Sequence, residues 1–351
     1  MSEMNPDFTV EPVVKADLCP VWDVCTEIAQ NMSYPSFFCS GDWLKASAEH
    51  LCREDSLLVL VVKLDGRIKA VLPLVSKPNA LGGRDLRFLG TDFYPDPVGL
   101  ISRPCDRARC AKALHEYLLK VPDWDRFILD WVLEDELADW NLPAKSVSVE
   151  PFKILPRNFD DLLGEFKQKK RYNLRSMVRK FLESGGELVS SVDNGTHTFF
   201  LDALFALHQK RALERALEST FEGGRVESLH RLLAQESSMV RFYGLRLHDK
   251  LIAVIYGFEF CNRFFYYQVA HDPAYGDLSP GSVLLFLALE NCCSKGVTEF
   301  NFLQGDESYK GIWTNESRVL YRCDMKRGTW RSHLFSVLDQ SKELCKRVRG
   351  R

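Results

Sequence analysis

The sequence predicts an α/β (α+β) fold built as two lobes in tandem, each a mixed, largely antiparallel sheet flanked by helices. The first observation is an internal similarity between two β-rich hairpin segments. Leu57–Val75 turns at Asp65-Gly66, and Val240–Phe260 turns at His248–Lys250. The two turns align at an offset of 183 residues (248 − 65). Two copies of one supersecondary plan explain this internal similarity, with chance similarity between two hairpins as the alternative.

The second observation is that each half continues from its hairpin in the same way. A helical pattern leads to a short apolar β run, first as Asp106–Lys120 and Phe127–Val132, then as Gly281–Lys295 and Val297–Leu303. A helix that returns the chain to a neighbouring strand produces a parallel crossover. We therefore expect a sheet that combines an antiparallel meander with one parallel pair.

The first half begins with a helix capped by Asp42 that runs through Leu51. Asp106 caps the next helix, and Pro122 stops it. The stretch 146–157 contains two prolines and is interpreted as the crossing point between the halves. These boundaries predict an N-terminal lobe over residues 1–150.

The second half begins with a long amphipathic helix. Asn158 caps it, apolar residues recur every three or four positions, and Gly185-Gly186 ends it. A second helix is expected from about Thr198 to Leu217.

A three-strand meander follows over Met239–Ala270. Its strands are apolar on both faces, so helices should cover both sides. Arg318–Met325 is expected to be the last strand, and Ser332–Arg351 a basic helix or tail. The predicted C-terminal lobe covers residues 151–331, and the tail covers 332–351.

Composition and charge exclude several classes of protein. The 351 residues include 46 Lys and Arg and 48 Asp and Glu, a net charge of −2, so the surface as a whole is not suited to nucleic acid or an anionic membrane. Apolar runs such as Val283–Leu289 have seven residues, whereas a membrane span needs ~20. The polar Met1–Asp7 segment lacks the basic and apolar regions of a secretory signal, which predicts a cytoplasmic protein.

The cysteines do not indicate disulfides or a metal site. There are eleven, an odd number, and none forms a C-x-x-C pair. No cluster of His and Cys has the spacing of zinc ligands. We expect reduced thiols in a core and no bound metal.

Two polar segments of the second half suggest a site. Tyr275–Gly281 joins a meander strand to a helix, and a proline near a helix start leaves backbone N–H groups free to attract an anion such as pyrophosphate. An ordinary N-cap is the alternative. Asn301–Lys310 leaves the end of a strand, where ligands bind in α/β sheets. It concentrates two carboxylates, a phenol and an amine.

A basic segment precedes them. Lys167–Lys180 holds seven Lys and Arg and no acid, and Arg171, Arg175 and Arg179 would share one helix face. Such a self-repelling row favours contact with phosphate groups, with a solvated face near acidic neighbours as the alternative.

Three segments together resemble the FemAB/CelD-type (BioF-like) branch of the GNAT acyltransferases. They are Trp43-Leu44 with Leu64–Leu74, then Ser279-Pro280-Gly281, and then Gly296–Lys310, which ends in Gly-Asp-x-x-Tyr-Lys. The resemblance covers about residues 35–330. It implies two GNAT-like lobes with acyl transfer in a cleft between them, the N-terminal lobe serving as platform and acceptor wall.

The resemblance implies an N- or O-acyltransferase. It would move an acetyl or longer acyl group directly from acyl-CoA to an amine or hydroxyl of a small molecule, a lipid or a surface-polysaccharide precursor. Acyl-CoA is the expected co-substrate, with no permanently bound cofactor, no nucleic-acid partner and a monomeric or homodimeric state. Two alternatives stay open: a Fem-like transferase that uses aminoacyl-tRNA, and a non-catalytic binding protein that keeps the fold.

The expected site residues form three groups. The catalytic group removes the acceptor's proton, protonates the leaving thiolate and stabilises charge: Asp306 or Glu307, Tyr309 (or Tyr275) and Lys310. The donor group surrounds an oxyanion and pyrophosphate, and all of its members except Pro280 offer a backbone N–H: Gln268, Val269 and Ala270, and Ser279, Pro280, Gly281 and Ser282. The substrate group comprises Arg171, Arg175, His208, Arg211, His271, Gln304 and Trp313.

Overall fold

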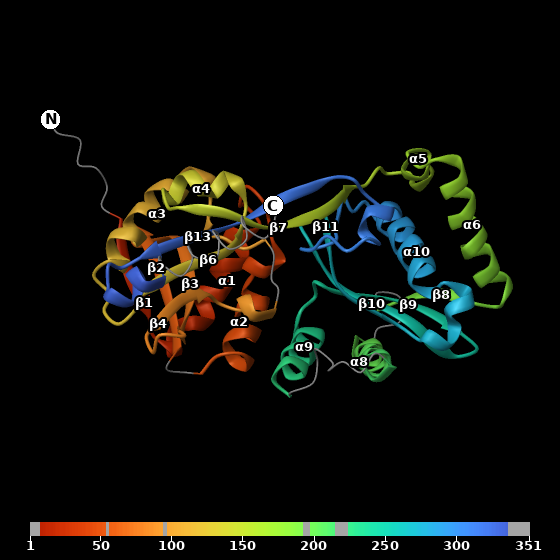
Figure 1. Cartoon of the computed structure of the whole chain (residues 1–351), viewed down its shortest axis with the longest axis horizontal. Coiled ribbons are helices and arrows are strands. Elements are labelled where there is room, and N and C mark those ends of the chain that lie inside the picture. Colours follow the sequence, from red (N-terminus) through yellow and green to blue (C-terminus); the bar gives the residue numbers. More distant parts are fainter. Residues whose placement is uncertain (1–7, 54–55, 94–96, 192–196, 215–223, 336–351) are drawn as a thin grey trace. The chain divides into compact units, whose positions relative to one another are not determined.

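The computed structural model describes residues 8–53, 56–93, 97–191, 197–214 and 224–335. The chain forms two compact units. Unit 1 comprises Met1–Ala48, Cys52–Ser148 and Val319–Arg351, and unit 2 comprises Glu49–Leu51 and Val149–Arg318. Each unit contains a run of paired strands with helices on both faces (Figure 1), so the predicted α/β fold class is confirmed.

In unit 1 the sheet order is β1-β2-β3-β4-β6-β13, with β5 beside β3, and the neighbours are antiparallel except β4 and β6. The strands are β1 (Thr9–Val13), β2 (Leu57–Leu64), β3 (Arg67–Pro78), β4 (Arg84–Phe88), β5 (Ile101–Ser102), β6 (Arg126–Val132) and β13 (Ser317–Lys326). The helices are η1 (Lys15–Asp17), α1 (Leu18–Ala29), η2 (Phe37–Cys39), α2 (Gly41–His50), η4 (Thr91–Phe93), α3 (Pro104–Leu118) and α4 (Glu134–Trp140).

In unit 2 the order is β7-β12-β11-β10-β9-β8, and the neighbours are antiparallel except β11 and β12. The strands are β7 (Ala144–Ile154), β8 (Glu187–Ser190), β9 (Val240–Leu247), β10 (Lys250–Phe260), β11 (Arg263–His271) and β12 (Glu299–Asn301). The helices are α5 (Phe159–Gly164), α6 (Gln168–Glu183), α8 (His197–Glu214), α9 (Arg225–Glu236), η5 (Pro273–Leu278), α10 (Pro280–Ser294) and η6 (Lys310–Ile312).

The two units repeat one element order. The series β1-α1-α2-β2-β3-β4-α3-β6 of unit 1 corresponds to β8-α8-α9-β9-β10-β11-α10-β12 of unit 2. The predicted hairpins occupy equivalent positions in it. Both turn through two residues with positive φ, Asp65-Gly66 (51° and 74°) and His248-Asp249 (46° and 61°), as tight hairpin turns require. The predicted parallel crossover is also present, through α10 between β11 and β12.

The strand that completes each sheet comes from the other half of the sequence. Phe152–Ile154 of β7 pair with β12 in unit 2, and β13 pairs through Tyr321–Lys326 with β6 in unit 1. The expected C-terminal lobe over 151–331 is therefore corrected. Residues 319–331 belong to unit 1 because backbone hydrogen bonds join β13 to β6. Residues 336–351 of the expected tail lie outside the described residues.

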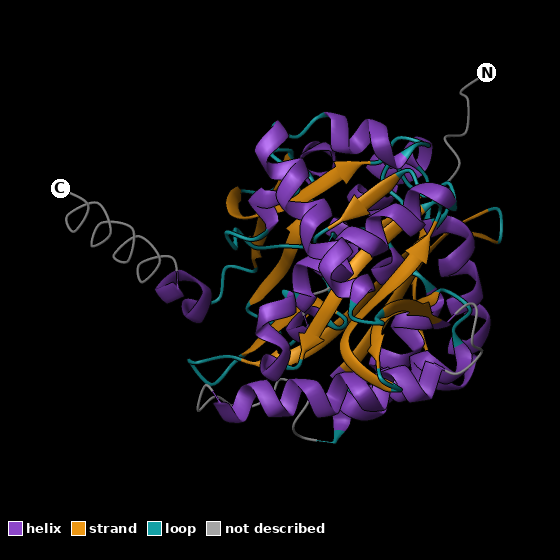
Figure 2. Ribbon diagram, turned by 90° about the vertical axis from the view of Figure 1, so that its right-hand side faces the viewer, coloured by secondary structure: helices purple, strands orange, loops and turns teal. Residues whose placement is uncertain are grey.

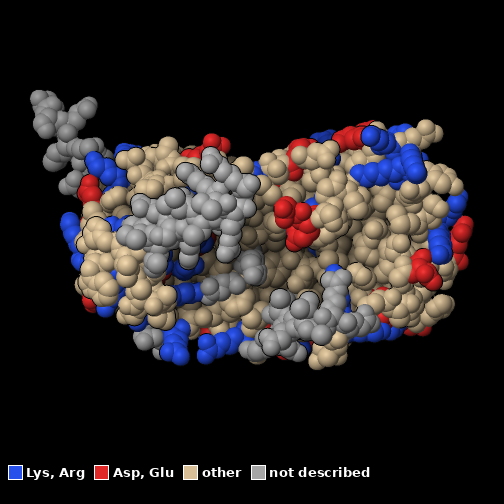
Figure 3. All heavy atoms as spheres, viewed as in Figure 1, with Lys and Arg blue, Asp and Glu red and all other residues tan. Residues whose placement is uncertain are grey.

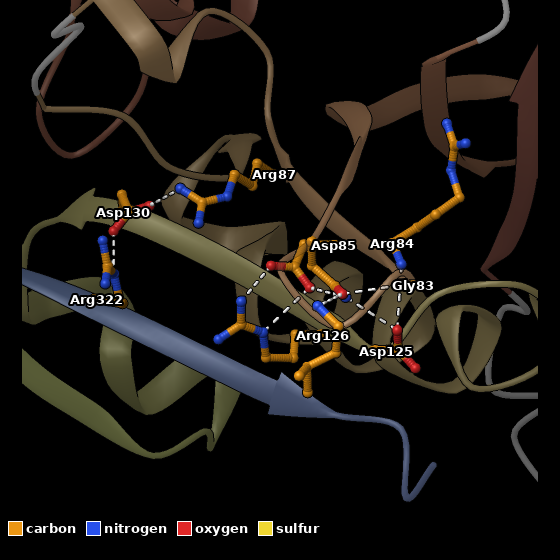
Figure 4. A network of polar contacts seen from close by, with 10 residues as sticks. Gly83, Arg84, Asp85, Arg87, Asp125, Arg126, Asp130 and Arg322 are labelled. Carbon is orange, nitrogen blue, oxygen red and sulfur yellow. Dashed lines mark hydrogen bonds and ion pairs between the residues drawn. The ribbon is translucent and has the colours of Figure 1, made fainter. Parts of the chain in front are cut away.

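Buried carboxylates add side-chain links to the strands of unit 1 (Figure 4). Asp85 on β4 pairs with Arg126 on β6. Asp130 on β6 pairs with Arg87 on β4 at 3.5 Å and with Arg322 on β13. Both carboxylates are buried, so pairing them avoids the cost of an uncompensated charge. Arg322 thus ties β13 to this unit by charge as well as by backbone hydrogen bonds.

Helices cover both faces of the unit 2 sheet, as expected from its apolar strands. α5, α6 and α10 lie on one face, and α8 and α9 on the other (Figures 1 and 2). α10 is apolar on nearly every side, and all of Val283–Leu289 is buried. Within the described part of the chain, no helix is both long and apolar enough to cross a membrane.

The long helix expected after Asn158 is two helices, α5 and α6, separated at residues 165–167. Glu165 in this break forms an ion pair with Lys153 of β7. Phe166 packs edge-on against Trp313, with ring centroids 6.3 Å apart. Helical periodicity continues across the break, so the sequence pattern could not show it, and these tertiary contacts explain it.

Candidate active site in unit 2

The C-terminal part of β11 diverges from β12. The pairing of β10 with β11 shifts register between Tyr256 and Gly257, which leaves Tyr267 as the extra residue of a bulge. Within β11, the residues that pair with β12 are Arg263–Phe265. Gln268–Ala270 therefore have β10 on one side and no strand of the described residues on the other. An unpaired strand edge presents backbone groups to a ligand.

The start of α10 follows β11 through η5. Ser279 is left-handed (φ 50°) and Pro280 opens the helix. The N–H of Ser282 donates to the Ser279 carbonyl at 3.0 Å, whereas that of Gly281 has no acceptor among the described residues. A Cβ at Gly281 would lie 3.6 Å from Nδ1 of His271, an ordinary contact. The predicted donor segment thus presents a free N–H at a helix start.

Asp272 braces this turn. Its carboxylate accepts hydrogen bonds from Lys210 on α8, from Lys250 on β10 at 3.1 Å and from the N–H of Ala274 at 3.1 Å. Burial by itself raises the pKa of Asp272, but the two lysine hydrogen bonds outweigh burial and hold the pKa at about 2. The carboxylate next to the candidate residue His271 is therefore ionised, paired and structural.

We expect Asp272→Asn to lower the free energy of unfolding by up to about 2 kcal/mol at pH 7. The native pKa lies below the ordinary value of 3.8, so this stabilisation is present above pH 4 and is lost as the pH falls towards 2. Urea unfolding of variant and parent at pH 7 and pH 3 measures it. Asp277→Asn, at an exposed carboxylate in the same turn, is the control. A difference independent of pH would contradict the ion-pair explanation.

The loop after β12 is held from inside by Lys310. The Lys310 side chain is buried, and its ammonium donates to the carbonyls of Leu303 (3.1 Å) and Gln304 (2.7 Å). It also pairs with the carboxylate of Glu307 at 2.8 Å. All three ammonium donors are used within the loop. The predicted catalytic residue Lys310 therefore stabilises the loop that carries the other candidates.

A buried polar pair sets the start of the same loop. Asn301 donates through Nδ2 to Glu150, and its Oδ1 accepts from the N–H of Leu303 at 2.7 Å. Leu303 is left-handed (φ 57°), a conformation that costs energy for a branched residue. Burial raises the pKa of Glu150, while the charge of Arg318 opposes that rise. Asn301 and Glu150 thus act as positioning residues for the loop.

Tyr309 and Tyr266 interact with each other beside this loop. Tyr266, the first residue of β11 beyond its pairing with β12, shares a hydrogen bond between hydroxyls with Tyr309. Burial and the charge of Glu307 raise the pKa of Tyr309 to about 12, whereas the Tyr266 hydrogen bond and the charge of Arg211 lower it. Tyr309 is therefore a neutral proton donor at pH 7. Its side chain keeps 36% exposure, so a ligand can approach it.

Arg211 and His208 lie on α8, and the charge of Arg211 affects the pKa values of nearby groups. The Arg211 charge acts on both tyrosines. Arg211 therefore shares one electrostatic environment with Tyr309, which lies about a hundred positions later in the sequence. Burial and the charge of Arg211 lower the pKa of His208. The imidazole is therefore neutral at pH 7 and can accept a proton.

The remaining predicted residues lie in several environments. Asp306 is exposed and has no ion pair among the described residues. Trp313 is buried in the core. In β11, Gln268 accepts a hydrogen bond from the neighbouring Val269 N–H at 3.2 Å, and Ala270 is fully buried. Arg171 and Arg175 line a separate hollow of α5 and α6.

Sequence reasoning missed Tyr266, Asn301 and Glu150 as functional candidates. Tyr266 lies in an apolar strand and nothing local marks it. Asn301 offered a signal, because a fully buried amide at the end of an apolar strand needs partners. Glu150 lies 151 positions before that amide.

Comparison with known proteins finds a family for most of unit 2. Residues 168–311, from α6 to η6, match the family described as acetyltransferase (GNAT) domain. Unit 2 contains a GNAT domain. The GNAT acyltransferase part of the resemblance inferred from the motifs is thereby confirmed, and the domain supports acyltransferase activity.

Solved structures share the fold of the chain. FemX has a TM-score of 0.64 and 12% identity, covering 87% of this chain and 95% of FemX. L-PGS from Bacillus licheniformis has a TM-score of 0.53 and 14% identity, covering 74% and 82%. The C-terminal domain of a putative lysylphosphatidylglycerol synthetase from Agrobacterium fabrum has 0.56 and 11%, covering 90% and 94%. Among curated proteins, none matches the sequence.

Proposed function

We propose that the protein transfers an acyl group from acyl-CoA directly to an amine or hydroxyl, with the GNAT domain of unit 2 as the catalytic part. The observation that carries this proposal is the Tyr309–Tyr266 pair beside the charge of Arg211, at the point where β11 leaves β12. The acceptor is proposed to be a small molecule, a lipid or a surface-polysaccharide precursor.

The proposed transfer forms one bond and breaks one. The acceptor's lone pair attacks the thioester carbonyl, a carbon–nitrogen or carbon–oxygen bond forms, and the carbon–sulfur bond breaks. Tyr309 gives its proton to the leaving sulfur, and the hydrogen bond from Tyr266 with the charge of Arg211 stabilises the resulting phenolate. Asp306 or neutral His208 takes the proton that the acceptor loses, since Glu307 is engaged with Lys310.

The donor is proposed to bind along β11 and the start of α10. The Gly281 N–H and the positive end of the α10 dipole suit a diphosphate. On the unpaired edge, the Val269 N–H suits the oxyanion of the tetrahedral intermediate once the Gln268 side chain that accepts from it moves aside. Calorimetry with acetyl-CoA, longer acyl-CoAs and free CoA tests the donor. Absence of binding to all of them would overturn acyl-CoA as donor and favour aminoacyl-tRNA.

We expect Gly281→Ala to weaken CoA binding at least 10-fold. A Cβ fits beside His271, and Ala suits a helix better than Gly, so the variant should fold as stably as the parent. The added methyl instead occupies space next to the N–H that the diphosphate would approach. Calorimetry measures the dissociation constant, and Gly164→Ala, where a Cβ meets open space at the end of α5, is the control. Equal CoA affinity in both variants would show that the start of α10 is not part of the donor site.

A further inference from the structure

A row of three arginines lines a surface hollow of unit 2. Arg171, Arg175 and Arg179 follow one another at four-residue steps along α6 and line a hollow of about 590 Å³. Basic atoms gather over the α5–α6 region in Figure 3. The rest of the wall consists of Gln168, Tyr172 and Ser176 on α6 and Asp160 and Leu163 on α5.

The wall carries an excess of positive charge. Its single carboxylate, Asp160, pairs with Arg175 at 2.8 Å, and both side chains are more than half exposed, so the pair contributes little stability. Arg179 reaches Glu183 only at 3.9 Å. Arg171 has no acidic partner among the described residues. Like charges four residues apart destabilise a helix, so a bound anion would offset a cost that the free protein carries.

We propose that this hollow, walled by Arg171, Arg175 and Arg179, binds a phosphate or diphosphate group of a small ligand. Guanidinium groups present paired N–H donors that match phosphate oxygens. The size of the hollow lies within the ~300–1,000 Å³ range of small-molecule sites. A net charge of −2 for the whole chain argues against a surface built for RNA.

The helix that carries the arginine row is hydrogen-bonded to the segment that precedes α10. Lys180, next to Arg179 on α6, donates to the carbonyl of Asp277 in η5 at 2.9 Å. A phosphate in the hollow can therefore belong to an acyl donor that reaches the start of α10, or to a separate phosphorylated acceptor. The phosphate site itself does not depend on the proposed acyl transfer.

Calorimetry with inorganic pyrophosphate tests the site. Arg171→Gln combined with Arg175→Gln should raise the dissociation constant at least 10-fold. Asp160→Asn removes the only carboxylate of the wall and should lower that constant about 2- to 5-fold. Arg246→Gln is the matched control, because Arg246 on β9 is a partly exposed arginine that pairs with Glu187 of β8 at 2.8 Å, and it should change nothing.

The arms of the experiment separate the sources of the phosphate. If the double variant weakens pyrophosphate and CoA alike, the phosphate belongs to the donor. If it weakens pyrophosphate alone, the phosphate belongs to the acceptor. An unchanged pyrophosphate affinity in the double variant overturns the site. Binding of a short RNA with a steep salt dependence, in the absence of pyrophosphate binding, overturns the small-ligand assignment.

Discussion

Tyr309→Phe should lower kcat ~10²-fold while acyl-CoA binding stays within about twofold. The substitution keeps the ring and its packing and removes the phenolic hydroxyl, a proton donor that is neutral at pH 7 and accessible. The leaving thiolate must then take its proton from water. Steady-state kinetics with the donor found by calorimetry, together with calorimetry on the variant itself, measures both quantities.

Two further variants sharpen this test. Tyr117→Phe, on α3 of unit 1, removes a phenol remote in sequence and should leave kcat unchanged. Asp306→Asn removes the exposed carboxylate three residues after the left-handed Leu303 and should lower kcat if Asp306 accepts the proton. If Tyr309→Phe and Asp306→Asn both retain full turnover while acyl-CoA still binds, the catalytic assignment is wrong.

Lys310→Met should loosen the whole loop. Met fills a similar volume but makes no hydrogen bonds, so the carbonyls of Leu303 and Gln304 lose their donor and Glu307 loses its ion pair. Leaving such groups unsatisfied costs about 1–3 kcal/mol each when they are buried. Amide hydrogen exchange of residues 302–313 should quicken at least 10-fold. Turnover should fall ~10²-fold, because small displacements of a catalytic group are costly.

Lys295→Met is the control, since Lys295 is exposed at the end of α10. It should change neither exchange nor turnover. If Lys310→Met abolishes turnover while exchange of the loop stays at the parental rate, then Lys310 acts on the substrate, as the sequence motif first suggested. Hydrogen exchange and turnover are therefore both needed, because turnover alone does not distinguish a residue that stabilises the loop from one that acts on the substrate.

The hairpin plan was predictable because its signals are local. Asp65-Gly66 tolerates positive φ, and β-rich runs flank it, so neither strand needs distant information to be recognised. The same holds for α10, where Pro280 and a continuous apolar run define both start and burial. The break between α5 and α6 could not be predicted from the sequence, because it depends on the ion pair of Glu165 with Lys153, a residue of another element.

The candidate site also has parts that the sequence predicts and parts that it does not. The sequence by itself determined the loop Asp306–Lys310 and the α10 start at Ser279–Ser282, since polar residues and a proline stand out against apolar strands. The sequence could not show that the Lys310 ammonium donates its hydrogen bonds to the carbonyls of Leu303 and Gln304. Those bonds depend on the left-handed conformation of Leu303.

Only the tertiary structure decided which side chains share one environment. Tyr266, Tyr309 and Arg211 come from β11, from the loop after β12 and from α8, and no spacing in the sequence relates them. It also decided that β13 completes unit 1 and β7 completes unit 2, because a strand's apolar pattern shows that it will pair but not with which edge. Local chemistry determines elements, whereas the backbone hydrogen bonds and charges of distant segments determine their partners.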